Sequence, residues 1–231
     1  WGSLFKHGEE LCGDKVEIVK NGTDTTMVLA DGLGSGVKAN ILSSLTSKIV
    51  STMLNAGADI SDVIETMAST LPVCKERLVA YSTFTFLRVS PTGDAHIVEY
   101  DNPPLILLRD GKSLDLPRRE REVEGKLITE TNIKLQPGDF CVFFSDGVIH
   151  AGIGKLLNLG WQQENVVEYL EKAYRKDVSA HFMQTQLLSA CNSLYMESPG
   201  DDTTVAVCKV RLPNVAYVMV GPPVDKAEDE K

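Results

Sequence analysis

The stretch Asp31-Gly32-Leu33-Gly34-Ser35-Gly36 decides how the rest of this 231-residue chain is interpreted. The apolar segment Thr26-Met27-Val28-Leu29-Ala30 precedes it and is typical of a buried strand. A helical pattern follows over Val37–Asn55, with apolar residues at every fourth position. These apolar residues are Val37, Ile41, Leu45, Ile49 and Met53. The sequence therefore predicts a strand, a tight glycine-rich turn that carries a carboxylate, and a long helix.

A hairpin is predicted upstream of this turn. Lys15–Val19 alternates polar and apolar residues, as a half-buried strand does. Asn21-Gly22 is a favourable hairpin turn, and Thr25–Ala30 returns as the partner strand. Asp14 begins the first strand, so we expect the hairpin to bring it close to Asp31 at the end of the second.

The remaining chain predicts an α+β fold. A second helix is expected over Ser61–Arg77, with its first residue as the N-cap. From residue 82 to residue 145 the period changes to two, which predicts a mainly antiparallel meander. Two amphipathic helices, Gln162–Arg175 and Ser179–Met196, precede a last strand over Thr203–Leu212. This order lacks the regular alternation of a doubly wound sheet and favours two packed sheets with helices on their outer faces.

Composition narrows the class of function. A net charge of −9 disfavours a nucleic-acid partner, because phosphate contacts need clustered Lys and Arg. The basic cluster Arg118-Arg119-Glu120-Arg121 is interpreted as a solvated loop, with phosphopeptide docking as the alternative. Five cysteines without CxxC spacing disfavour a disulfide framework or a zinc site and fit the cytoplasm. No apolar run approaches the roughly 18–20 residues that span a bilayer.

We expect one domain over residues 1–212 and a tail over residues 213–231. The tail ends in the charged run Asp225–Lys231, and we expect it to be partly disordered. The chain begins with Trp1-Gly2-Ser3 rather than Met, so a sensor or membrane domain upstream is a further expectation.

Aspartates at strand ends predict a metal site. Asp31, Asp146 and Asp201 each lie where an apolar strand meets a turn, and the hairpin adds Asp14. Hard cations such as Mg²⁺ and Mn²⁺ prefer oxygen ligands. Converging carboxylates would repel one another, whereas two bridging cations remove the conflict and can hold a hydroxide against a phosphoryl group. The carbonyl of Gly32, uncrowded by a side chain, is a further candidate ligand.

The simpler alternative is that each aspartate only forms a turn, since Asp-Gly is common in turns. The combination argues otherwise, because Asp201-Asp202 places two acids before an apolar strand. A dinucleotide-binding loop at Gly34-x-Gly36-x-x-Ala39 lacks the βαβ unit that should follow. The P-loop pattern and the Asp-x-Asp of haloacid-dehalogenase-like phosphatases are missing at this turn.

Three motifs resemble the signatures of the metal-dependent protein phosphatases, which include protein phosphatase 2C. Within them the chain is similar to the bacterial branch typified by stage II sporulation protein E, from about Cys12 to Val210. The resemblance implies a four-layer αββα sandwich, with two mainly antiparallel sheets flanked by helix pairs. The three motifs are Leu29–Ala39, Phe144–Val148 and Asp201–Val205; Gly13-Asp14, Asp101–Leu105 and Leu135–Asp139 resemble further landmarks.

The resemblance also implies an activity: hydrolysis of phosphoserine or phosphothreonine on a bacterial regulatory protein by direct attack of a metal-bridging hydroxide. It implies two Mn²⁺ or Mg²⁺ ions, and a partner among phosphorylated regulators of sigma factors. Two other functions are considered, a catalytically weak sensor or binding module and a small-molecule phosphohydrolase. By this resemblance, Asp31 would bridge the two ions and the carbonyl of Gly32 would bind one of them. Asp146 and Asp201 would bind the other ion. Asp14 would hold a metal-bound water, and Asp202 would have a supporting role.

Some positions depart from the pattern of eukaryotic members. Gly13 and Leu33 stand where many of those proteins have Glu and His, and Asp202 stands where many have Asn. No arginine corresponds to the one that binds phosphate in those relatives. No residue is assigned as the general acid. His150 is interpreted as a solvent-facing residue at the start of a helix.

Overall fold

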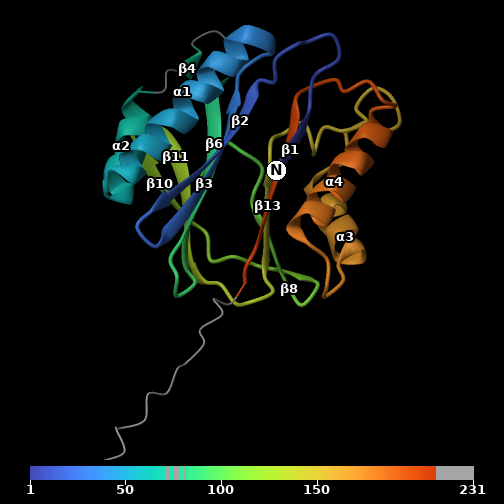
Figure 1. Cartoon of the computed structure of the whole chain (residues 1–231). Coiled ribbons are helices and arrows are strands. Elements are labelled where there is room, and N and C mark those ends of the chain that lie inside the picture. The colour runs from blue at the N-terminus through green and yellow to red at the C-terminus, as the bar shows by residue number, and fades with distance from the viewer. Residues whose placement is uncertain (71–72, 75–78, 81, 212–231) are drawn as a thin grey trace, which may run out of the picture.

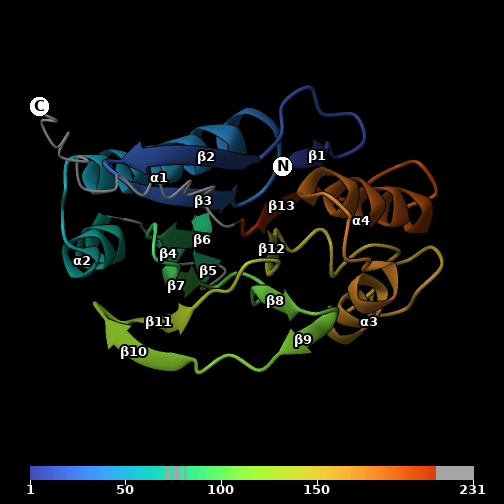
Figure 2. The same ribbon diagram turned by 60° about the horizontal axis from the view of Figure 1, so that its bottom comes forward.

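The computed structural model describes residues 1–70, 73–74, 79–80 and 82–211. Two β-sheets pack face to face, and a pair of helices covers the outer face of each sheet (Figures 1 and 2). This arrangement confirms the expected α+β sandwich of four αββα layers. The helices are α1 (Gly36–Asn55), α2 (Ile60–Thr70), α3 (Gln163–Ala173) and α4 (Ala180–Leu194).

The sheet beneath α1 and α2 has six antiparallel strands, in the order β10-β11-β7-β6-β3-β2. Its β2–β3 hairpin turns at Asn21 and Asp24, which face each other, and its other end pairs Asp14 with Asp31, as the sequence predicts. The strand ends that carry Asp14 and Asp31 thus lie side by side at one end of the sandwich. The strands are β10 (Arg119–Val123), β11 (Lys126–Lys134), β7 (Asp94–Tyr100), β6 (Ser82–Val89), β3 (Asp24–Gly32) and β2 (Asp14–Asn21).

The sheet beneath α3 and α4 has five antiparallel strands, in the order β1-β13-β12-β8-β9. Strand β13 lies between β1 and β12, so distant parts of the chain meet in one sheet. A separate pair consists of β4 (Val73–Cys74) and β5 (Val79–Ala80). The five strands are β1 (Gly2–Leu4), β13 (Thr203–Lys209), β12 (Phe140–Phe144), β8 (Ile106–Arg109) and β9 (Lys112–Leu114).

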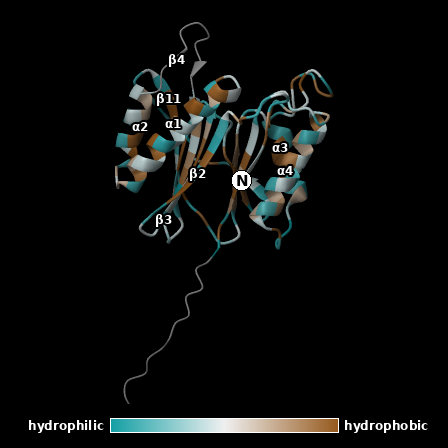
Figure 3. Ribbon diagram, turned by 45° about the horizontal axis from the view of Figure 1, so that its top comes forward, coloured by the Kyte–Doolittle hydropathy of each residue, from teal (hydrophilic) through white to brown (hydrophobic). Residues whose placement is uncertain are grey.

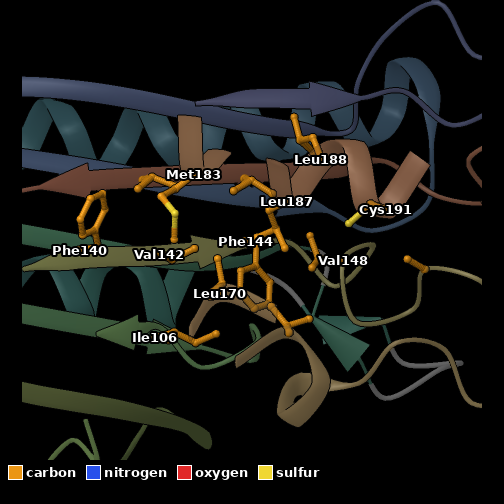
Figure 4. Packing of buried hydrophobic residues seen from close by; sticks show 14 of the residues in the cluster. Ile106, Phe140, Val142, Phe144, Val148, Leu170, Met183, Leu187, Leu188 and Cys191 are labelled. Atoms are coloured by element: carbon orange, nitrogen blue, oxygen red, sulfur yellow. The ribbon is translucent and has the colours of Figure 1, made fainter. Parts of the chain in front are cut away.

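Three apolar clusters hold the layers together. The cluster between the sheets includes Leu29, Leu87 and Phe143, which come from both sheets. The cluster beneath α3 and α4 packs large side chains of the helices on β12 and β13 (Figure 4). The cluster beneath α1 and α2 includes Val50 and Met67. Burial of each large apolar side chain contributes roughly 1.5–3 kcal/mol, so these clusters supply most of the stability.

Helix α1 forms where the sequence predicts it, but the first half of its packing face is made of small residues. Ala39, Ser43 and Ser47 are buried against the sheet, whereas Val37 and Ile41 are more than half exposed. The reason is close approach: a Cβ on Gly32 would lie 2.0 Å from the carbonyl oxygen of Ala39. Large side chains on that face would push the helix off β3.

Some predicted boundaries were wrong. The helix expected over Ser61–Arg77 begins at Ile60 and ends at Thr70, and Val73–Cys74 is a strand. Pro72 lacks the amide hydrogen that a continuing helix needs, which explains the early end. Strand β10 takes up most of the basic cluster expected to be a loop: its backbone pairs with β11, and Arg121 contacts Glu130 on β11 at 2.6 Å.

The predicted bounds of the other three helices agree with the structure within a few residues. The single meander expected over residues 82–145 was wrong, because its strands are divided between the two sheets. Ser179 is the N-cap of α4, and its hydroxyl accepts the amide hydrogen of Phe182. The described cysteines, Cys12, Cys141, Cys191 and Cys208, are free thiols. Within the described ranges, the helices are too short or too polar for a membrane span. The predicted tail, residues 213–231, lies outside the described residues.

Candidate metal centre

Four aspartates lie at the same end of the sandwich, the upper end in Figure 1. Asp14 begins β2 and faces Asp31 near the end of β3, so this pair comes from the six-stranded sheet. Asp146 follows β12 and Asp201 precedes β13, which are neighbours in the five-stranded sheet. The topology thus brings together carboxylates that are up to 187 positions apart (201 − 14) in the sequence.

Asp14 is the most deeply placed of the four. Its side chain is buried, and its Oδ2 accepts a hydrogen bond of 2.7 Å from the hydroxyl of Ser145. The Ser145 hydroxyl in turn accepts the amide hydrogen of Thr204 at 2.9 Å. The other oxygen, Asp14 Oδ1, is buried without a hydrogen-bond partner. Burial first, and then the charges of Asp202 and Asp146, raise the pKa of Asp14 to about 7.

Asp31 shares this environment. Burial raises its pKa well above the usual value, and the charges of Asp14, Asp146 and Asp201 raise it further. Its backbone is fixed by Ser82 on β6, whose hydroxyl donates to the Asp31 carbonyl at 2.8 Å. Carboxylates of both sheets therefore repel one another at this position.

Asp146 and Asp201 complete the cluster from the other sheet. Burial raises the pKa of both, and the charge of Asp146 adds to the effect on Asp201. His150 partly offsets the effect on Asp146, because its Nδ1 lies 3.6 Å from Asp146 Oδ2. The expectation of a helix-start histidine was wrong: residues 147–152 form turns, and the His150 ring contacts a candidate ligand.

Asp202 has a different part in the structure. It is buried, and its two oxygens accept the amide hydrogens of Lys6 at 3.0 Å and Gly13 at 2.8 Å. The carbonyl of Gly13 then accepts the amide hydrogen of Gly32 at 3.2 Å. Asp202 therefore fixes the backbone that carries Asp14 and the Gly32 carbonyl.

The sequence did not disclose these contacts. They join residues 189 and 196 positions apart, and no local pattern reports such a distance. Ser145 and Thr204 were missed for the same reason, although both adjoin residues that the sequence singled out. The structure gives a steric reason for glycine at position 147, because a Cβ there would lie 2.1 Å from the carbonyl oxygen of Asp202.

The donor set fits a hard divalent cation in kind. Its side chains offer carboxylate oxygens, which Mg²⁺ and Mn²⁺ prefer, and Asp14 Oδ1 is an oxygen without a partner. The raised pKa values express a repulsion that positive charge would relieve. Within the part of the chain that the structure describes, no three His, Cys, Asp or Glu side chains are gathered closely enough to hold an ion as they stand.

Solved structures share this fold. The phosphatase domain of SpoIIE from Bacillus subtilis, in a crystal form without domain swapping, is 18% identical with a TM-score of 0.68, covering 96% of this chain and 95% of that chain. The RsbU and RsbW domains of Rv1364c from Mycobacterium tuberculosis are 17% identical with a TM-score of 0.69, covering 90% of this chain and 59% of that chain. RsbX in complex with magnesium is 21% identical with a TM-score of 0.62, covering 89% and 91%.

These likenesses establish the fold, which is that of PP2C phosphatase domains. This chain spans only about three-fifths of two of the similar chains, which carry further domains or fragments. A comparison with curated protein sequences gives no match. The profile of one family, described as Stage II sporulation protein E (SpoIIE), matches residues 21–211, which is most of the sequence. The chain therefore belongs to the SpoIIE family.

Proposed function

We propose that this protein is a metal-dependent phosphatase that removes phosphate from serine or threonine of a protein. The observation that carries the proposal is the carboxylate cluster at one end of a PP2C fold. Two sheets contribute Asp14, Asp31, Asp146 and Asp201; burial raises the pKa of all four, and neighbouring carboxylates raise the pKa of Asp14, Asp31 and Asp201 further. A fold that needed these residues only for stability would gain from replacing such carboxylates by apolar side chains.

The residues divide into ligands and supports. We propose that Asp31 and the Gly32 carbonyl hold one cation, and that Asp31, Asp146 and Asp201 hold a second. When bound, such cations lower the pKa of a water that serves as nucleophile and neutralise the phosphoryl oxygens. Ser145 supports this set, because its hydrogen bond orients Asp14 with one oxygen free to hold a water. The proposed reaction is direct hydrolysis, without a phosphorylated side chain.

Similar structures support Mg²⁺ or Mn²⁺ as the cation. RsbX was solved in complex with magnesium, and the SpoIIE phosphatase domain was solved after soaking with manganese. Other similar chains are RsbU and RsbW domains and a protein of the bacterial stressosome. From these we propose a phosphorylated bacterial regulatory protein as substrate, of the kind that controls sigma factors, and a cytoplasmic location.

The test is phosphate release from a phosphoserine peptide with Mn²⁺, comparing wild type with Asp31→Asn. Loss of a charge that stabilises the transition state should lower kcat by about 10²–10³-fold or more. Asp115→Asn is the matched control, because Asp115 is exposed and outside the cluster. Chelation with EDTA should abolish phosphate release. Isothermal titration should show weaker Mn²⁺ binding by Asp31→Asn than by wild type, and unchanged binding by Asp115→Asn.

Equal turnover by wild type and Asp31→Asn would refute the proposal. Mn²⁺ binding without turnover of any phosphate ester would favour the sensor module instead. Turnover of p-nitrophenyl phosphate but of no phosphopeptide or phosphoprotein would favour the small-molecule phosphohydrolase.

A further inference from the structure

Three large apolar side chains project from the loop between the Asp146 turn and α3. Ile153, Leu156 and Leu159 are 46%, 57% and 75% exposed. We call these three residues the apolar ridge. Single exposed apolar residues are normal on a protein surface, but three within seven positions form a local patch of the kind that binds partners.

The loop that carries the ridge is held firmly in place. The carbonyl of Gly152 accepts the amide hydrogens of Lys155, Leu156 and Leu157 at 3.0–3.1 Å. Gly160 has a φ of +78°, and a Cβ there would lie 2.6 Å from the carbonyl oxygen of Ile149. The exposure of the ridge is therefore part of a defined loop conformation, and does not result from loose packing.

The same loop is joined to the candidate metal centre. The amide of Ile153 donates to the carbonyl of His150 at 3.1 Å, and the His150 ring contacts Asp146. Lys155 Nζ donates to the carbonyls of Tyr195 and Ser198 at 2.5 Å each. The hydroxyl of Tyr195 donates to the carbonyl of Gly147 at 2.7 Å. In Figure 1 this loop, yellow to gold, stands at the upper right beside the top of α4.

These contacts make the ridge a fixed rim on the Asp146 side of the centre. Within residues 151–160, Lys155 carries the only charge of the sequence, and its ammonium group binds backbone carbonyls. The rim thus offers an almost uncharged, apolar surface beside the centre. Apolar side chains of a substrate would gain from burial there.

We propose that the apolar ridge binds the protein part of the substrate, by taking up apolar side chains close to the phosphorylated serine or threonine. This rests on the proposed phosphatase function and specifies its substrate: a phosphoprotein whose site is flanked by Leu, Ile, Val or Phe. The metal centre would supply the chemistry and the ridge the selectivity.

The test uses two phosphoserine peptides that differ only at three flanking positions, with leucine in one and serine in the other. Wild type with Mn²⁺ should show at least a tenfold higher kcat/KM for the leucine peptide. The double variant Leu156→Ser and Leu159→Ser should reduce that preference to within about twofold, because roughly 1.4 kcal/mol corresponds to tenfold. Leu127→Ser is the control, since Leu127 is equally exposed but lies on β11.

Hydrolysis of p-nitrophenyl phosphate separates this inference from the proposed function. All variants should hydrolyse it at the wild-type rate, because it has no flanking residues. Turnover of p-nitrophenyl phosphate without preference for the leucine peptide would overturn the ridge proposal and leave the phosphatase intact. Absence of all turnover would overturn both. A wild-type dimer that the double variant converts to monomer, seen by light scattering, would assign the ridge to self-association and overturn the proposal.

Discussion

The longest helix over each sheet, α1 on one and α4 on the other, packs in an opposite way. Helix α4 buries Met183, Leu187 and Cys191, and its large side chains fill the cluster over β12 and β13. Helix α1 buries mainly small residues in its first half, whereas Val37, Ile41 and Leu45 are exposed. Figure 3 shows brown, hydrophobic segments along this helix beside hydrophilic ones. The difference shows that apolar spacing can locate a helix without identifying the face that packs.

The hydroxyl groups of α1 explain how small polar residues can be buried there. Ser43, Ser47 and Ser51 each donate to the carbonyl three residues earlier, at 3.2 Å, so burial leaves these hydroxyls satisfied. Ser51 also donates to Glu17 on β2. Such contacts contribute about 1 kcal/mol each, less than the roughly 1.5–3 kcal/mol of a large buried apolar side chain. The first half of α1, which buries no large apolar side chain, is therefore expected to be the more weakly attached part.

The largest expected effect comes from truncating a large buried side chain of α4. Leu187→Ala should lower the free energy of unfolding by about 2–5 kcal/mol, because it leaves a cavity in the cluster beneath α4. Leu45→Ala on α1 should change it by less than about 0.5 kcal/mol, since Leu45 is exposed. Urea unfolding followed by circular dichroism measures both. Similar losses in the two variants would show that Leu45 packs against something in solution.

A change of pH should test the carboxylate cluster, to which both sheets contribute. The folded state raises the pKa of Asp14 to about 7, above the ordinary value of 3.8. A raised folded-state pKa means that the native state binds the proton more tightly than the unfolded state does. The stability that this group contributes is therefore fully present below about pH 4 and is lost as pH rises through 7. We expect the metal-free protein to lose on the order of 2 kcal/mol between pH 5 and pH 8.

Thermal unfolding with EDTA at the two pH values measures this loss. Mn²⁺ at pH 8 should restore the stability, because cations bind the deprotonated carboxylates. A melting temperature that rises between pH 5 and pH 8 without metal would contradict the assignment of Asp14.

The smallest expected effect sharpens the comparison without any mutation. Amide hydrogens of residues 41–47 in α1 should exchange about tenfold faster than those of residues 184–191 in α4, corresponding to roughly 1.4 kcal/mol in opening free energy. Native-state hydrogen exchange with mass spectrometry resolves the two segments. Equal protection would mean that close backbone packing stabilises α1 as well as large side chains stabilise α4.

The sequence predicted those features that depend on neighbouring residues. The sequence predicted a hairpin turn near Asn21-Gly22 that brings Asp14 close to Asp31; the observed turn residues are Gly22 and Thr23, one position later, and their register places Asp14 opposite Asp31. Ser179 marked the start of α4. Features that depend on distant residues were missed or wrong. The buried face of α1 depends on its distance from β3, and strand β10 depends on its backbone pairing with β11. The support that Asp202 gives to Gly13 follows from the topology alone.

The position of β13 has a consequence for biosynthesis. This strand lies between β1 and β12, and Asp202 beside it holds the amides of Lys6 and Gly13. A nascent chain synthesised only as far as Gly200 has neither that carboxylate nor a partner for β1. Since pairings between distant residues form late in folding, we expect the carboxylate cluster to be completed only after β13 has left the ribosome. A chain that ends before this strand therefore lacks Asp201 and Asp202, two members of the candidate site and its support.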